Sequence, residues 1–269
     1  MSIHFNQIDH YLNKLAKQDL CYQPGHFWKE ALAEISNCFI KTGLSSFRKE
    51  DVNLKFFVPT YGPPGNGFEK DEISSFLRGL ELGTTIKQKD FTKLWLNGNM
   101  QALADYRTFI ASNFTADNFN LLQFSESHVG DPMEHFKFNG NYFSRSSLNY
   151  LLGLSYLKKV VPQFVPQKIL EIGGGFGTLG EIIFKSSIKN FRYINLDLPP
   201  MFIIARNYLK YATKKNEVFF VDCYNEPSNL NIDDLPQISC LPNWYINRLK
   251  GNIDLFVNFL AFQEMEPNI

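Results

Sequence analysis

The spacing of apolar residues predicts helices in the first part of the chain. Over 7–16 and again over 28–40, an apolar side chain recurs every three to four positions, as on one face of a helix. A similar pattern fills roughly 71–112. The aromatic-rich segment 53–61 is predicted to be extended. The Gly- and Pro-rich residues 62–70 are predicted to form a loop, because these residues continue neither a helix nor a central strand.

A second break separates this helical part from the rest of the chain. Gly and Pro interrupt the pattern within 125–132, which makes this segment a candidate site loop. Ser144 or Ser146 can cap a helix that runs to about Lys159. We therefore expect two regions, a mostly helical one over 1–143 and a second one over 144–269.

From Lys168 onward the pattern changes to short apolar segments that alternate with helical ones. Strands are predicted at 168–172, 191–196, 218–221 and 253–259, and helices at 179–184 and 201–211. Strands that alternate with helices form a parallel sheet covered by helices on both faces. The sequence therefore predicts an α/β fold, with 253–259 as the fourth strand.

Composition and charge exclude several classes of partner. The chain has 269 residues, of which 44% are hydrophobic, and its 27 Lys and Arg balance its 27 Asp and Glu. With no excess positive charge and no basic run, nucleic acid is not an expected partner. No secretory signal and no apolar stretch of about 20 residues is present, so we expect a cytoplasmic protein without membrane insertion. Four scattered cysteines without a C-x-x-C pair indicate reduced thiols.

A glycine-rich segment follows the strand predicted at 168–172. Gly173, Gly175 and Gly177 allow a sharp turn and a close approach of the backbone to a ligand. The segment from Gly175 to Gly180 also matches the G-x-G-x-x-G pattern of a dinucleotide site. Glu171, however, precedes the glycines. Its carboxylate would repel a pyrophosphate but attract the amino group of a methionine moiety, which favours a sulfonium cofactor over NAD.

These residues resemble the class I S-adenosylmethionine-dependent methyltransferases, whose first motif, E-x-G-x-G-x-G, is matched by residues 171–177. The resemblance implies a Rossmann-like sheet and S-adenosyl-L-methionine as cofactor. It implies that Asp197, 20 residues after Gly177, binds the ribose hydroxyls. It also implies that Asp222 lies near the adenine, with a turn-forming role as the alternative. Tyr142 and Arg145 are candidates to reach the cofactor carboxylate, with packing between the two regions as the alternative.

More narrowly, the chain resembles the bacterial sugar O-methyltransferase family. The resemblance is carried by the segments 27–30, 56–62, 148–154 and 170–181. It implies transfer of a methyl group to a hydroxyl of a sugar or sugar nucleotide, in surface polysaccharide biosynthesis. The helical region over 1–143 would then bind the substrate or act as a lid. The resemblance is compatible with a homo-oligomer.

An alcohol is a poor nucleophile until a base takes its proton, so the reaction needs a base near the sulfonium. Glu264, after the strand predicted at 253–259, is the first candidate. His128 and His135, which flank the predicted site loop, are the alternatives. This chain has the segment Asp-Leu-Pro at 197–199. In plant methyltransferases with a similar segment, a histidine acts just after the strand that corresponds to 253–259. The aligned residue in this chain is Gln263, which cannot act as a base. No metal-ligand spacing is present, and a metal-independent reaction is expected.

The resemblance implies a sheet of seven strands, whereas the fourth predicted strand lies close to Ile269. The second region is therefore expected to be truncated after that strand. Two further functions stay open. One is an NAD-dependent oxidoreductase that binds its cofactor through Gly175, Gly177 and Gly180. The other is a non-catalytic module that has kept the cofactor pocket but lost turnover.

Overall fold

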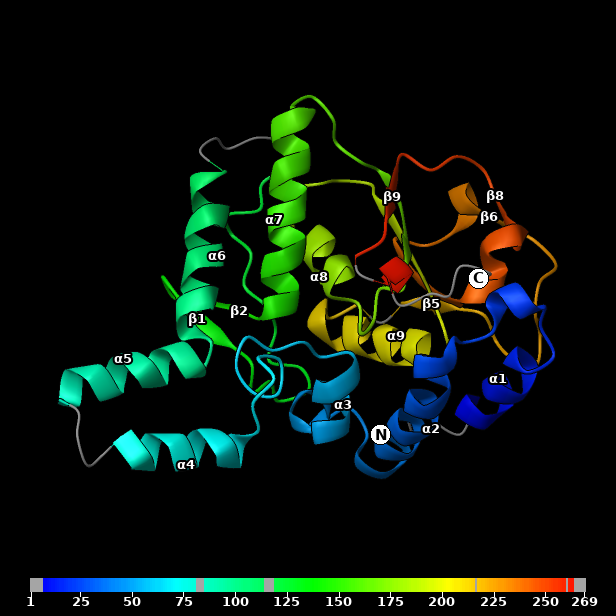
Figure 1. Cartoon of the computed structure of the whole chain (residues 1–269). Helices are drawn as coiled ribbons and strands as arrows, with labels where there is room; N and C mark the ends of the chain where they lie inside the picture. The colour runs from blue at the N-terminus through cyan, green and yellow to red at the C-terminus, as the bar shows by residue number, and fades with distance from the viewer. Residues whose placement is uncertain (1–6, 81–84, 114–118, 216, 260, 264–269) are drawn as a thin grey trace.

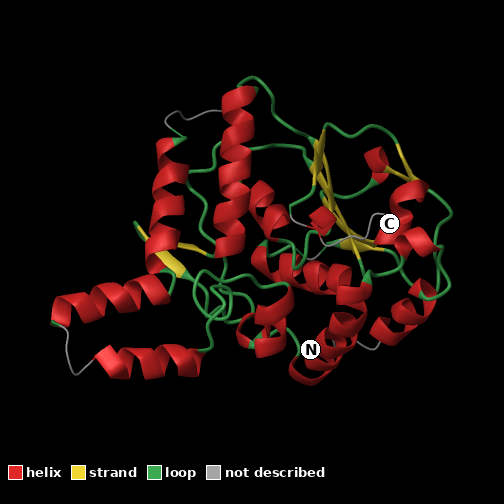
Figure 2. Cartoon of the chain, viewed as in Figure 1, coloured by secondary structure: helices red, strands yellow, loops and turns green. Residues whose placement is uncertain are grey.

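The structure is a computed structural model that describes residues 7–80, 85–113, 119–215, 217–259 and 261–263. Helices surround a sheet, and the N-terminal helices lie beside it (Figures 1 and 2). The elements before the sheet are α1 (Ile8–Leu15), α2 (His26–Thr42), α3 (Asp51–Phe56), α4 (Lys70–Leu80), α5 (Ile86–Leu96), α6 (Asn99–Ala111), β1 (Phe136–Phe138) and β2 (Asn141–Phe143). The helical character predicted for this part of the chain is confirmed.

One prediction in this region is wrong, because the first half of the segment predicted to be extended is the helix α3. Asp51 lies in its first turn, where a carboxylate interacts favourably with the helix dipole. The Asn53 side chain donates a hydrogen bond to the carbonyl of Phe47 (2.8 Å), and Leu54 is buried. These tertiary contacts outweigh the strand propensity of the aromatic residues. The loop predicted to follow is present, and α4 begins at Lys70.

The second region is an α/β unit with a parallel sheet. Its larger elements are α7 (Arg145–Val160), β3 (Lys168–Ile172), α8 (Thr178–Lys185), β4 (Arg192–Asp197), α9 (Met201–Ala212), β5 (Phe219–Phe220), β7 (Ile238–Pro242) and β9 (Leu255–Val257). The sheet has the order β5-β7-β4-β3-β9, and every neighbouring pair is parallel. A small separate sheet pairs β6 (Leu230–Asn231) with β8 (Leu249–Lys250). The predicted α/β class is confirmed, and the architecture is compatible with a Rossmann-like fold.

The strand β7 was not predicted. All five of its residues are buried, and it lies between β4 and β5. Its sequence, Ile-Ser-Cys-Leu-Pro, is short, mixes polar with apolar residues and ends in proline, so it gives no clear strand signal. As a result, the segment predicted as the fourth strand contributes β9, the fifth strand of this sheet along the described part of the chain. The strand that pairs with β4 is β7 and not β5.

The helices of the α/β unit order the surroundings of the glycine-rich loop. Ser144 caps α7 by accepting a hydrogen bond from the backbone N–H of Ser147 (3.2 Å), as predicted. Helices α8 and α9 pack on β4, and α6 packs on α7 (Figure 1). In the described part of the chain, no helix is long and apolar enough to cross a membrane.

A buried cluster of charges, centred on Arg48, joins the two regions. The Arg48 guanidinium has no exposed surface, and it donates hydrogen bonds to Glu134 (2.6 Å) and Glu126 (2.7 Å). The second oxygen of Glu126 accepts the N–H of Ser144, the residue that caps α7 (2.8 Å). Burial by itself would raise the pKa of the Glu126 carboxyl, but the charge of Arg48 lowers it well below its usual range. The guanidinium also lies 4.8 Å from the ring centroid of Phe176, in the glycine-rich loop.

Replacing Arg48 by methionine should destabilise the fold strongly, because Glu126 and Glu134 would stay buried without their cation. We expect the Arg48→Met variant to lose about 3–5 kcal/mol of unfolding free energy, measured by urea denaturation at pH 7. The matched control is Arg107→Met on the exposed face of α6, with an expected change below about 0.5 kcal/mol. Equal losses in the two variants would contradict a linking role for Arg48.

Candidate functional site

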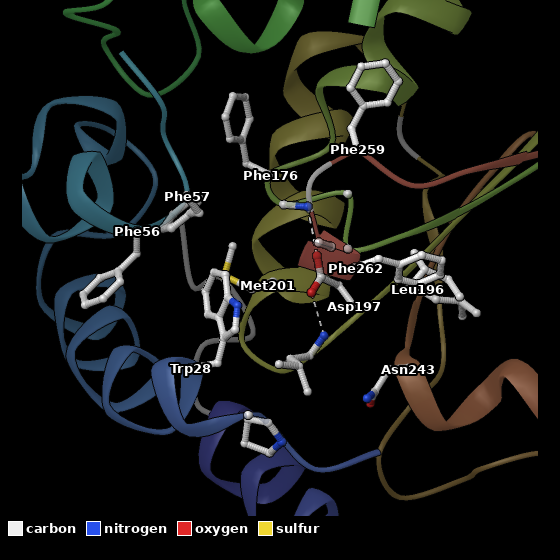
Figure 3. Close-up of a pocket in the computed structure, with 18 of the residues that line it drawn as sticks. Trp28, Phe56, Phe57, Phe176, Leu196, Asp197, Met201, Asn243, Phe259 and Phe262 are labelled. Carbon is white, nitrogen blue, oxygen red and sulfur yellow. Dashed lines mark hydrogen bonds between the residues drawn. The ribbon is translucent and has the colours of Figure 1, made fainter. Parts of the chain in front are cut away.

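A cavity of about 560 Å³ lies where the glycine-rich loop leaves the sheet (Figure 3). Its walls include residues at the carboxyl ends of β3 and β4 and residues just after β7 and β9. The chain order of the strands reverses beside β3, since β4 lies on one side of it and β9 on the other. Open α/β sheets bind their ligands at such a point, and the volume is in the range of small-molecule sites.

The glycine-rich loop has the conformation that its sequence predicts. Gly173, Gly175 and Gly177 have φ values of +73°, +56° and +97°, in the left-handed region that side chains disfavour. A Cβ on Gly173 would collide with Ala261, which also lines the cavity. Gly173 and Gly175 line the cavity, whereas Gly177 lies outside it as the N-cap of α8. A ligand in the cavity can therefore reach the loop backbone directly.

Asp197 lies at the carboxyl end of β4 and lines the cavity, as expected of a ligand-binding carboxylate. One oxygen accepts the backbone N–H of Gly175 (2.9 Å) and the other that of Leu198 (2.7 Å), as Figure 3 shows. The loop thus fixes the orientation of Asp197 at the wall of the cavity.

Glu171 lies behind the loop and does not line the cavity. It is completely buried beneath Gly174 and accepts hydrogen bonds from the hydroxyls of Tyr150 (2.6 Å) and Tyr193. Burial raises the pKa of its carboxyl group to about 7, although these two hydrogen bonds oppose the shift. The direct contact between Glu171 and a ligand amino group that the sequence predicted is therefore not available in this geometry. Glu171 instead anchors Tyr150, whose side chain does line the cavity.

Asp222 is exposed and lies outside the cavity, where its carboxylate accepts the N–H of Tyr224 (3.0 Å). The residue that follows the strand next to β4 is Asn243, and it lines the cavity. Its amide nitrogen donates to the carbonyl of Tyr22 (2.8 Å), whereas its Oδ1 is buried without a hydrogen-bond partner among the described residues. The sequence prediction missed Asn243 because it missed β7.

Two predicted catalytic residues, His128 and His135, lie together in the segment before α7 and not in the cavity. The centroids of their rings are 5.2 Å apart, and the ring centroid of Tyr142 lies 4.3 Å from that of His128. His135 Nε2 lies 3.5 Å from a carboxylate oxygen of Glu126, so it belongs to the edge of the Arg48 cluster. Among the described residues, no group of three or more His, Cys, Asp or Glu is placed to hold a metal ion.

Arg145 also lies away from the cavity. Its guanidinium donates to the carbonyl of Thr60 (2.8 Å) and lies over the ring of Tyr61, so it packs between the two regions. Glu264 lies outside the residues that the structure describes, and its role as base stays a prediction.

The N-terminal region also supplies a wall of the cavity. The wall is aromatic and includes Trp28 of α2 and Phe56 and Phe57 at the end of α3. Nearby on α7, Ser146 and Asn149 add two uncharged polar side chains. Trp28, Phe56 and Phe57 lie in the segments 27–30 and 56–62 that carry the family resemblance, but no local pattern showed that long-range packing brings them to one cavity.

The charged side chains of the described cavity lining are of one sign, negative. Asp197 is the one carboxylate, and no Lys, Arg or His occurs, among the described residues that line the cavity. No protein-family model, no curated protein and no solved structure matches the chain significantly. The chemistry of this cavity is therefore the feature of the molecule that bears on its function.

Burial of Glu171 predicts a pH-dependent stability. The pKa of the Glu171 carboxyl is about 7 in the folded chain and about 4.5 in the unfolded chain. The free energy of unfolding that the protonated carboxyl contributes is therefore fully present below pH 4.5 and is lost as the pH rises to 7. The loss is on the order of 3 kcal/mol. We expect Glu171→Gln to remove this loss, so that its stability relative to the unmodified chain increases between pH 5 and 7. Urea denaturation at each pH measures this difference.

The matched control for Glu171→Gln is Glu30→Gln, at an exposed position on α2. Its stability should stay within about 0.5 kcal/mol of the unmodified chain at each pH. A stability difference for Glu171→Gln that does not vary with pH would show that the carboxyl keeps one protonation state throughout the range.

Proposed function

We propose that this chain binds S-adenosyl-L-methionine and is a methyltransferase that acts on a hydroxyl group of a small molecule. Following the family resemblance, the acceptor is a sugar or sugar nucleotide of surface polysaccharide biosynthesis. The observation that supports the proposal best is the position of Asp197. It lies beside the glycine-rich loop, at the carboxyl end of a central parallel strand, in a cavity whose described lining has no basic side chain.

The residues present fit this cofactor at several points. The carboxylate of Asp197, which lines the cavity, suits the two ribose hydroxyls. The unpartnered Oδ1 of Asn243 suits the amino group of adenine, because a buried acceptor without a donor is costly. Tyr150 and Phe259 both line the cavity, and the centroids of their rings are 4.6 Å apart. Their aromatic faces suit a cation such as the sulfonium. When bound, the sulfonium supplies an electrophilic methyl group.

An NAD-dependent oxidoreductase is the competing function. Gly180 favours it, since a Cβ there would lie 2.5 Å from the ring of Tyr193, and a dinucleotide fold uses a glycine for such close helix–strand packing. The charge of the cavity opposes it. A pyrophosphate would meet Asp197 and no cationic side chain in the described lining, and the N–H of Gly175 is already bonded to that carboxylate.

The proposed cofactor site predicts that Asp197→Asn binds S-adenosylhomocysteine 10- to 100-fold more weakly than the unmodified chain. This corresponds to the loss of charge-assisted hydrogen bonds, about 1.5–3 kcal/mol. Titration calorimetry measures the affinity. The control Asp222→Asn, outside the cavity, should bind as the unmodified chain does. Binding of NAD without binding of S-adenosylhomocysteine would favour the oxidoreductase instead.

The proposed base predicts a different pattern for Glu264→Gln. This variant should bind S-adenosylhomocysteine with unchanged affinity and lose at least 100-fold in methyl transfer, because general-base catalysis typically contributes that much. Turnover with labelled S-adenosylmethionine measures it, and Gln263→Ala is the control. Cofactor binding without turnover in the unmodified chain would indicate a non-catalytic module.

A further inference from the structure

The cavity has two chemically different sides. Figure 3 shows Trp28, Phe56 and Phe57 on the side of the N-terminal helices, and Leu196 and Asn243 on the side of the sheet. The polar groups proposed to bind the cofactor's adenosine lie towards the sheet. The aromatic wall and the neighbouring first turns of α7 therefore remain as the surface for a second ligand.

This second surface carries no described positive charge. Several basic residues adjoin lining residues in sequence but do not themselves line the cavity. Arg145, next to Ser146, donates to Thr60, and Arg248, next to Asn247, donates to Glu226 (3.2 Å). The Lys55 ammonium lies over the ring of its neighbour Phe56, 5.1 Å from the ring centroid. A diphosphate would lose its hydration here without gaining a cation in return.

The polar groups on this surface suit an uncharged hydroxylated ring. Ser146 and Asn149 are three residues apart on α7 and therefore share one face of the helix. A hydroxyl and an amide each donate and accept hydrogen bonds, as alcohol groups require. The aromatic side chains of the neighbouring wall offer flat apolar surface to the C–H face of a ring. Nothing in this set of groups selects for an anion.

We infer that the methyl acceptor is an uncharged glycoside that lies against Trp28, with its hydroxyls directed to Ser146 and Asn149, and is not a nucleotide sugar. The inference rests on the proposed function and narrows it. Of the two acceptor classes that the family resemblance implies, the charge of the cavity selects the one without phosphate.

Matched acceptor pairs test the inference on the full chain. Labelled S-adenosylmethionine is incubated with the methyl glycosides of glucose, mannose and rhamnose, and with UDP-glucose, GDP-mannose and dTDP-rhamnose. We expect kcat/KM at least 10-fold higher on the neutral member of a pair. Equal or faster transfer to the nucleotide sugar would overturn the inference, and so would failure of every neutral glycoside to bind the S-adenosylhomocysteine complex.

The failure of the inference can be distinguished from that of the proposed function. If S-adenosylhomocysteine itself does not bind in calorimetry, the proposed cofactor is wrong. If it binds and the complex then binds UDP or GDP alone at micromolar concentrations, the cofactor stands and the uncharged acceptor is wrong. We expect S-adenosylhomocysteine to bind and neither nucleotide to bind at 1 mM.

Two variants test the individual surfaces. Trp28→Ala should raise the KM for the glycoside at least 10-fold without changing the affinity for S-adenosylhomocysteine, whereas Trp95→Ala, exposed on α5, should change neither. Asn149→Lys places a cation in the cavity and should make UDP binding detectable. An unchanged KM in the first variant, or no UDP binding by a folded Asn149→Lys protein, would overturn the inference.

Discussion

The cavity depends on the buried charge of Arg48. A guanidinium without exposed surface must keep its carboxylates, because separating them leaves an uncompensated charge in the interior. Arg48, Glu126 and Glu134 all come from the N-terminal region, and Glu126 also accepts the N–H of Ser144, the residue that caps α7. The same guanidinium lies on Phe176 of the glycine-rich loop. One cluster therefore sets the position of the aromatic wall, the start of α7 and the loop relative to one another.

A second buried acid supports the cavity from behind. Glu171 precedes the glycine-rich loop, but its side chain is directed into the interior, where Tyr150 and Tyr193 donate to it. Gly174 is needed above it, since a Cβ there would come within 2.5 Å of the carboxylate. An acid at this place can thus act on a ligand through the loop and through Tyr150, without touching it. Asp197, by contrast, is a carboxylate that lines the cavity.

The parts of the site that were predictable from the sequence are those encoded locally. Alternating apolar segments and three closely spaced glycines identified β3, β4 and the loop, because strand periodicity and positive φ leave direct sequence signals. Asp197 was identified through the family resemblance. The strand β7 has a weak local pattern, so Asn243 was missed and Asp222 was taken in its place. Trp28 and Phe56 reach the cavity through tertiary packing alone, and that same packing makes α3 a helix where the sequence predicted an extended segment.

The two proposals use one electrostatic property of the cavity in different ways. In the proposed function, a cavity whose described lining has one carboxylate and no basic side chain favours a ligand with positive charge, as a sulfonium cofactor has. The same lack of cations in the described lining disfavours phosphate, which is the argument against both nucleotide sugars and dinucleotides. In these proposals, the side of the cavity towards the sheet selects the cofactor through Asp197 and Asn243. The side formed by the N-terminal region, which the Arg48 cluster holds against the loop, selects the acceptor.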